Sequence, residues 1–463
     1  MRRYLLVAGA IAATPGAARA HASEQGFVLL LPTDAYIAAG VATVALTVVL
    51  LAFLPGSTAA ACFRPAALLR LPRGGGTLRH LASCLSALLL IALVGAGLFG
   101  SRDPMVNPLP LTVWTVWWVA LVTVQGLVFD HWRWTNPWTG PAALLARLTG
   151  EAAPLRYPRA LGHLPGIAGF LAFAGFLLAD PAPADPGRLA VAAGLYWMAM
   201  LAGTACFGPR WLLRAEALTI LMRAYRRMAM LGRARGRTAV GLPGWKILAG
   251  PSAAPGLAVF ILLMLGSGSF DGLNETFWWM GQLGINPLEF PGRSAVVTPN
   301  LVGMLSANLA LLVVFILSIH LGVRIAGTDM PTRTAFALFA PSILPIALGY
   351  HIAHYVTVLL VDGQYALAAL TDPLNTGADV LGLGEYHVTT GFLYTPGPVR
   401  AIWLTQAGAV VAGHVLAILL AHALAVRAFG SNRRALLSQA PLAAFMVAYT
   451  FFGLWLLASP RGV

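Results

Sequence analysis

The chain has 463 residues, of which 58% are hydrophobic and only 10% are charged, and its formal net charge is +14. Soluble domains carry roughly 25% charged residues, so this chain lacks the polar side chains that a water-soluble surface needs. Composition therefore excludes a soluble enzyme or a nucleic-acid-binding protein, and three scattered cysteines exclude a disulfide-stapled secreted domain. Several apolar stretches reach about 20 residues, the length of a membrane-spanning helix. We predict an all-α, polytopic membrane protein.

The chain begins with the features of a secretory signal. Two arginines open the sequence, a short apolar stretch follows, and residues 18–20 form an A-x-A-like cleavage site. The apolar stretch is too short to cross a bilayer as a helix. We predict that residues 1–20 are a cleaved signal peptide and that the mature protein begins at His21. The alternative is an uncleaved amphipathic start.

Residues 21–463 are predicted to form one transmembrane domain with ten spans. The apolar stretches lie near residues 34–54, 81–100, 111–130, 164–179, 188–208, 253–268, 299–322, 334–361, 401–426 and 438–458. The longer outer loops cover residues 269–298 and 362–400. The lipid bilayer is therefore the first partner that the sequence predicts.

The basic residues give this topology an orientation. If the mature amino terminus lies outside, the inner loops are 55–80, 131–163, 209–252, 323–333 and 427–437. These five loops hold 22 of the 30 Lys and Arg residues. Such a positive-inside bias predicts a bacterial inner-membrane protein whose amino terminus and functional site face the periplasm.

Familiar soluble-enzyme motifs are missing or lie in the wrong context. Residues 95–100 match the dinucleotide pattern G-x-G-x-x-G, but they lie inside the second predicted span rather than after a strand. Close packing of helices through small residues explains them better. The sequence contains no Walker A motif, no H-E-x-x-H and no G-x-S-x-G, so neither an ATP-driven pump nor a serine hydrolase is supported.

Two groups of polar or aromatic residues are assigned ordinary roles. Six tryptophans surround the third span, and we interpret most of them as an aromatic belt at the interface: Trp114, Trp117, Trp118, Trp132, Trp134 and Trp138. Three histidines fall in the basic loops and are expected to be solvated: His80, His131 and His163.

Three other histidines lie at membrane depth and are the main candidates for function. His351 and His354 are spaced i, i+3 in the eighth span, which places both imidazoles on one helix face. His414 lies about halfway along the ninth span. Ionisable groups inside a membrane are costly and mark functional sites. We predict that these three bind one divalent transition metal, Cu, Zn, Mn or Fe. The alternative is that each one only hydrogen-bonds a backbone carbonyl.

Acidic residues near these spans supply further candidates. Asp372 lies in the outer loop between spans eight and nine, and with His354 and His414 it is predicted to be catalytic. Asp271 and Glu275 precede the seventh span. Gly272 and Asn274 indicate a turn there, and we favour helix capping for the two carboxylates over orientation of ligands.

The predicted mature terminus adds a fourth metal ligand. Cleavage after Ala20 gives His21 a free α-amino group, and that amine can chelate one metal ion together with the imidazole of the same residue, an arrangement suited to copper. The alternative is a disordered tip, which is common for chain termini.

Several stretches together resemble the bacterial integral-membrane family labelled fenitrothion hydrolase. They are Asn107-Pro108-Leu109-Pro110, Asp130-His131-Trp132-Arg133 through Asn136-Pro137-Trp138, Phe270-Asp271-Gly272 with Trp278-Trp279, Ala353-His354-Tyr355, Gly363-Gln364, Thr371-Asp372-Pro373 with Gly377 to Gly382, and Gly413-His414-Val415 through Ala421-His422. These motifs extend from about residue 105 to 430. The start His21-Ala22-Ser23 also resembles a histidine that follows the family's signal.

The resemblance implies hydrolysis of an apolar organophosphorus substrate, a phosphorothioate triester, with release of a nitrophenol. A bound cation would polarise the P=S or P=O group and activate water. The alternative from another class is a metal- or solute-handling permease that uses the same histidines.

Overall fold

The computed structural model describes residues 28, 31–70, 75–150, 153–382, 384 and 387–461. The predicted signal peptide, His21 and Glu385 lie outside the described residues. The described chain is helical apart from three short strands, β1 (Ala66–Ala67), β2 (Leu231–Ala234) and β3 (Arg237–Val240), which form one antiparallel sheet in the order β1-β3-β2.

Nine helical segments of the described chain are long and apolar enough to cross a membrane. They are α2 (Thr33–Phe53), α4 (Gly76–Phe99), α5–η1–α6 (Pro108–Leu127), α10 (Pro186–Phe207), α14 (Pro255–Asn274), η4–α16 (Arg293–Ile325), α17–η5–α18 (Thr332–Thr371), α19 (Pro396–Phe429) and α20 (Asn432–Ala458). A tenth apolar helix, α9 (Leu164–Ala179), has 16 residues. The prediction of an all-α, multi-pass membrane protein is confirmed, and each of the ten predicted spans overlaps one of these helices.

Shorter helices connect the spans. They are α3 (Ser57–Cys62), α7 (Trp132–Thr135), α8 (Thr139–Thr149), α11 (Pro209–Arg214), α12 (Ala217–Tyr225), α13 (Trp245–Ala249) and α15 (Phe277–Gln282), with 3-10 turns at Arg159–Leu161, Pro287–Glu289 and Gly391–Tyr394. The sheet and α13 lie in or beside the loops that carry most of the Lys and Arg residues. We call that end of the bundle the basic end.

Two of the spans are interrupted by other helix types. Residues Leu111–Leu121 form η1, a π-helix between α5 (Pro108–Pro110) and α6 (Val122–Leu127). Residues Ala340–Ile343 form η5, a 3-10 turn between α17 (Thr332–Phe339) and α18 (Leu344–Thr371). Pro341 lies in this turn and lacks the N–H that an α-helix requires. Both interruptions lie in spans that contribute to the site described below.

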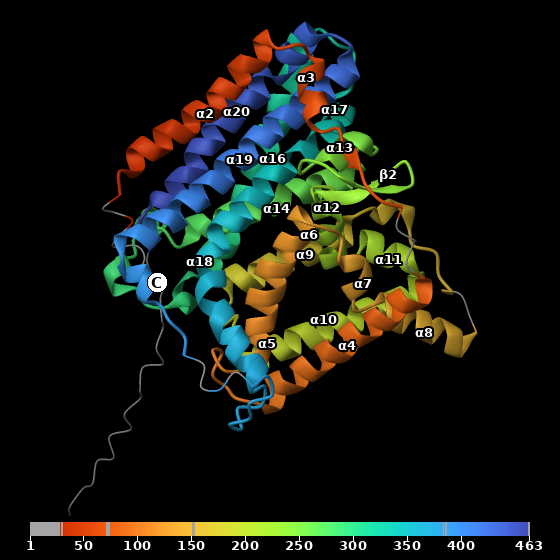
Figure 1. The fold of residues 1–463 in the computed structure, drawn as a ribbon, viewed down its shortest axis with the longest axis vertical. Helices are drawn as coiled ribbons and strands as arrows, with labels where there is room; N and C mark the ends of the chain where they lie inside the picture. Colours follow the sequence, from red (N-terminus) through yellow and green to blue (C-terminus); the bar gives the residue numbers. More distant parts are fainter. Residues whose placement is uncertain are drawn as a thin grey trace, which may run out of the picture.

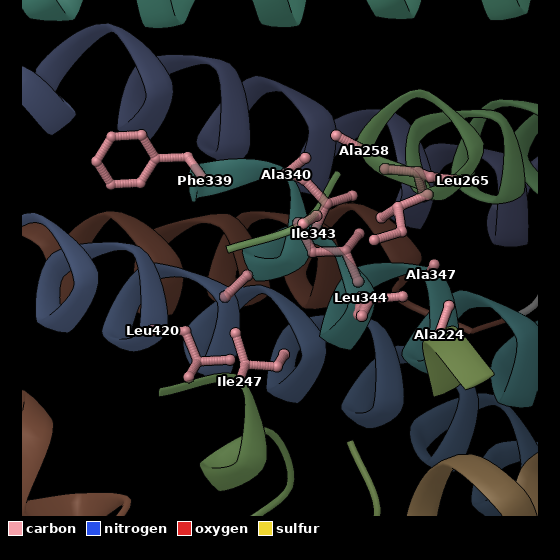
Figure 2. Packing of buried hydrophobic residues seen from close by; sticks show 14 of the residues in the cluster. Ala224, Ile247, Ala258, Leu265, Phe339, Ala340, Ile343, Leu344, Ala347 and Leu420 are labelled. Atoms are coloured by element: carbon pink, nitrogen blue, oxygen red, sulfur yellow. The ribbon is translucent and has the colours of Figure 1, made fainter. Parts of the chain in front are cut away.

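The helices α14, α18 and α19 form the centre of the bundle, whereas α2 and α4 lie at its surface. Figure 1 shows α2, α20 and α19 side by side and α4 beside α10, in agreement with their contacts. Figure 2 shows the apolar packing around η5, where Ile343 and Leu344 belong to one buried cluster with Leu265 of α14 and with Leu420 of α19, which lies beside Ile247. This packing fixes α18 between its neighbours.

Glycines allow α18 and α19 to approach each other closely. A Cβ atom at Gly413 would lie 2.6 Å from the carbonyl oxygen of Pro345, and one at Gly349 would lie 2.4 Å from the carbonyl oxygen of Ala409. Close backbone approach through small residues is a common way of packing membrane helices, since lipid offers no hydrophobic force to join them. Gly97 of α4 likewise allows close packing against Leu109 and Ala190, as the sequence predicts for residues 95–100.

The Gly413→Ala variant is therefore expected to lose about 1–3 kcal/mol of stability, because its methyl group meets backbone that cannot rotate away. Thermal unfolding in detergent measures the change. Gly408→Ala is the matched control on the same helix, since a Cβ atom there meets no atom within 4 Å. Equal unfolding temperatures for the two variants would contradict the close contact.

The expectation for His131 is wrong, and two of the six tryptophans lie outside an interfacial belt. His131 is buried rather than solvated, since its Nε2 lies 2.8 Å from the carbonyl oxygen of Leu121 and its Nδ1 lies 3.1 Å from Thr135 Oγ1. It thus holds the end of the π-helix. Trp132 and Trp138 are buried in the main core rather than placed in an interfacial belt. Their indole nitrogens donate to Thr219 Oγ1 and to the Trp197 carbonyl.

Candidate functional site

A buried histidine–carboxylate pair joins the two central helices α14 and α18. His354 Nε2 lies 3.2 Å from Asp271 Oδ2, and the two side chains are only 8% and 12% exposed. The hydroxyl of Tyr355 donates to the same carboxylate oxygen. A carboxylate only accepts hydrogen bonds, so His354 carries its proton on Nε2 when it is neutral. Its Nδ1 is buried without a hydrogen-bond partner and keeps its lone pair.

Local sequence explains how this pair forms. His354 and Tyr355 are adjacent in α18, and the i, i+3 spacing puts His351 on the same side as His354. Asp271 lies in the last turn of α14, and Gly272 follows it. A Cβ atom at Gly272 would lie 1.8 Å from the hydroxyl oxygen of Tyr350. Glycine is therefore required for α14 to come close enough to α18 for Asp271 to reach His354.

An inner chamber of about 40 Å³ lies on one side of this pair. Most of its walls are apolar side chains from α9, α12 and α14, with Trp118 of the π-helix η1. The Trp118 ring packs edge-on against His351, with centroids 5.1 Å apart. His351 Nε2 is buried and has no partner. A water needs about 10–15 Å³ of such space, so the chamber has room for a few waters between two imidazoles.

An outer chamber of about 220 Å³ lies on the other side, at the end of the bundle opposite the basic end. Its walls include the charged residues Glu275, Arg293 and Arg461, together with Gln406, Thr357 and apolar side chains such as Leu177 and Leu457. Asp271, His354 and Tyr355 line both chambers. Together with Leu177 and Leu178, which also line both chambers, these three residues form the partition between a small apolar chamber and a larger polar one.

His414, which the sequence groups with His351 and His354, lies elsewhere. It is buried in α19, its Nδ1 lies 2.9 Å from the Val410 carbonyl oxygen of its own helix, and its nearest recorded ring neighbour is Tyr449 at 6.4 Å. It lines neither chamber. The backbone hydrogen bond matches the alternative role set out for it from sequence.

Asp372, the predicted catalytic carboxylate, lies at the carboxyl end of α18 and outside both chambers. It is partly exposed, and its oxygens accept from the backbone N–H groups of Thr376 at 2.9 Å and Gly377 at 2.7 Å. The hydrogen bond from Thr376, followed by that from Gly377, holds the pKa of Asp372 below its usual range. Its local role is to order the start of the outer loop.

The described residues do not complete a metal centre by themselves. Nowhere among them do three His, Cys, Asp or Glu side chains gather closely enough to hold one metal ion. His351 and His354 remain available as two ligands, and His21 lies outside the described residues. A metal site built from three such ligands would thus need at least one ligand from the rest of the chain. The metal assignment stays a prediction.

Asp271 is the residue that sequence reasoning undervalued. The sequence analysis favoured helix capping for it, but α14 continues through Asp271 to Asn274, and Thr276 caps the next helix by accepting from the Trp279 N–H at 3.2 Å. The sequence signal that points to Asp271 is the free-energy cost of burying its carboxylate. A carboxylate placed at the end of an apolar span needs a partner, and a histidine on another span provides one.

Comparison with known protein families, with curated proteins and with solved structures finds no match to this chain.

Proposed function

We propose that this protein is a membrane-embedded hydrolase of apolar organophosphorus triesters, with His354 as the base that activates water. The observation that carries the proposal is the buried His354–Asp271 pair between an apolar and a polar chamber. In a typical histidine general base, one ring nitrogen donates to a carboxylate and the other is free to accept a proton from water. In His354 these nitrogens are Nε2 and Nδ1, respectively. The motif resemblance supplies the substrate class.

In the proposed reaction, water bound at His354 Nδ1 gives one proton to that nitrogen. Its oxygen forms a new bond to phosphorus, and the bond from phosphorus to the aryl oxygen breaks. The leaving group takes both electrons of that bond as a nitrophenolate. The second product is a dialkyl phosphorothioic acid, which gives the remaining proton of the attacking water to solvent and becomes an anion, and the imidazolium later returns its own proton to solvent. Asp271 stabilises the imidazolium that forms, while the Tyr355 hydroxyl fixes the orientation of the carboxylate.

The two chambers support a division of roles. The inner chamber is too small for a whole triester but has room for water. The outer chamber is larger and combines apolar walls with polar groups, so we place the body of the substrate there. An apolar triester partitions into the bilayer, which concentrates it around the protein. We also propose that the outer chamber opens to the periplasm, as the distribution of basic residues favours.

The test is nitrophenol release by the purified protein in nanodiscs, without nucleotide or soluble cofactor. A nitrophenolate is a good leaving group and needs no strong general acid. We therefore expect a dimethyl nitrophenyl phosphorothioate to react at least about 100-fold faster than the dimethyl phenyl compound, since the phenolate is a poorer leaving group. Equal rates, or no release above empty nanodiscs, would contradict the proposal.

A permease is the second candidate, and the interrupted spans favour it. Discontinuous helices near a buried polar site are typical of transporters, and both η1 and η5 break spans that line or support the inner chamber. Uptake of the intact triester or of a metal ion into sealed vesicles, with no chemical product, would support transport over hydrolysis.

A further inference from the structure

Arg461 has an unusual environment for a residue near the end of the chain. Its backbone forms an isolated antiparallel bridge with Thr276, and the neighbouring Pro460 carbonyl accepts from the Phe277 N–H at 2.9 Å. These contacts hold the chain end against the turn that follows α14. The side chain of Arg461 lines the outer chamber. Its position is thus fixed by the segment that directly follows the helix that carries Asp271.

The guanidinium of Arg461 is only partly satisfied. One terminal nitrogen donates to the Leu456 carbonyl at 3.3 Å, whereas Nε is buried and has no hydrogen-bond partner. A buried donor without a partner costs about 1–3 kcal/mol. The other arginine of the chamber, Arg293, differs, because its Nε and one terminal nitrogen donate to the carbonyls of Asp180 and Leu177. Of these two arginines, Arg461 is therefore the one that has a buried donor without a hydrogen-bond partner.

We infer that Arg461 is an anion-binding residue of the outer chamber and takes the anionic phosphorus product of the reaction. Guanidinium donors form strong, often bidentate hydrogen bonds to phosphoryl oxygens. The neutral triester carries no such charge, so Arg461 acts mainly once hydrolysis has produced an anion. The inference rests on the proposed function for the identity of the anion, although the anion site itself stands on the geometry of Arg461.

Two carboxylates in the outer chamber weaken the binding of an anion to Arg461. Asp271 accepts hydrogen bonds from the neutral donors His354 and Tyr355, which stabilise its negative charge but do not cancel it. Glu275 also lines the chamber and repels an anion. A cation that attracts the product and a carboxylate that repels it together give weak binding, which suits release into water. Replacement of Glu275 by Gln is accordingly expected to tighten anion binding.

The experiment measures binding of dimethyl thiophosphate to protein in nanodiscs by phosphorus NMR titration. The background is the His354→Asn variant, so that binding is read without turnover. We expect Arg461→Gln to weaken binding at least tenfold, Arg461→Lys to weaken it less, and Glu275→Gln to strengthen it. Arg400→Gln is the control, since Arg400 is an exposed arginine of α19 that lines neither chamber. Unfolding temperatures report whether each variant is folded.

The outcomes separate the two proposals. Loss of binding in Arg461→Gln but not in Arg400→Gln supports the anion site, even if the wild-type protein hydrolyses no triester. Equal binding by Arg461→Gln and the His354→Asn background overturns it, even if hydrolysis is confirmed. Inorganic phosphate provides the second probe. If it binds as tightly as dimethyl thiophosphate, the site takes free phosphate and its assignment to the reaction product is wrong.

Discussion

Replacement of His354 by Asn should reduce hydrolysis of a nitrophenyl triester by about 10²–10⁴-fold, the usual contribution of a general base. Asparagine is smaller and still hydrogen-bonds Asp271, but it offers no lone pair basic enough to take a proton from water. The loss should appear in kcat, because the triester itself makes no hydrogen bond to this nitrogen before reaction. Initial rates of nitrophenol release in nanodiscs measure it.

His320→Asn is the matched control, since His320 is an exposed residue of α16 that hydrogen-bonds Thr332 far from the chambers. The same assay also separates the base from the metal prediction. If His414→Asn or His21→Ala abolishes both activity and bound transition metal as fully as the His354 change, a metal centre replaces the general base. Full activity in His354→Asn would falsify the mechanism outright.

Asp271→Asn is expected to lower kcat by a similar factor, about 10²–10⁴-fold, because it changes which ring nitrogen of His354 carries the proton. The amide of Asn can donate to Nε2, which moves the imidazole proton to Nδ1 and removes the lone pair that the proposed mechanism requires. It also leaves the imidazolium uncompensated in a buried site. The side chain keeps its size and can still accept from Tyr355, so the unfolding temperature should change little.

The control for Asp271→Asn is Asp34→Asn, an exposed carboxylate at the start of α2 that lines neither chamber. The nitrogen NMR signals of His354 give a readout independent of rate. The protonated nitrogen should be Nε2 in the wild-type protein and Nδ1 in the variant. An unchanged tautomer together with an unchanged rate would remove Asp271 from the mechanism.

The spans were predictable because lipid imposes a simple rule on sequence. Each backbone polar group must be satisfied within the helix, so an apolar stretch of sufficient length becomes a span. The pairing of His351 and His354 in one chamber was likewise predictable, because it depends only on the spacing within α18. Neither inference required knowledge of which helices are neighbours.

The rest of the site depends on contacts between helices, which a single sequence does not encode in a local pattern. The Gly272 and Asn274 pair suggested a turn, whereas in the structure Gly272 makes room for Tyr350 inside a continuous helix. His414 occupies a plausible depth but faces Tyr449. The π-helix Leu111–Leu121 places Trp118 beside His351. Its sequence contains no residue, such as proline, that would predict a departure from the α-helix.

The shortness of α9 has a consequence for the surrounding lipid. Sixteen residues of helix extend about 24 Å, roughly 6 Å less than the hydrocarbon thickness of an ordinary bilayer. Lipid beside a short span thins to match it or the protein tilts. Because Leu177 and Leu178 of α9 line both chambers, that thinning occurs beside the site. Turnover should therefore fall as the acyl chains of the host membrane lengthen, which makes bilayer thickness a physical control on access to His354.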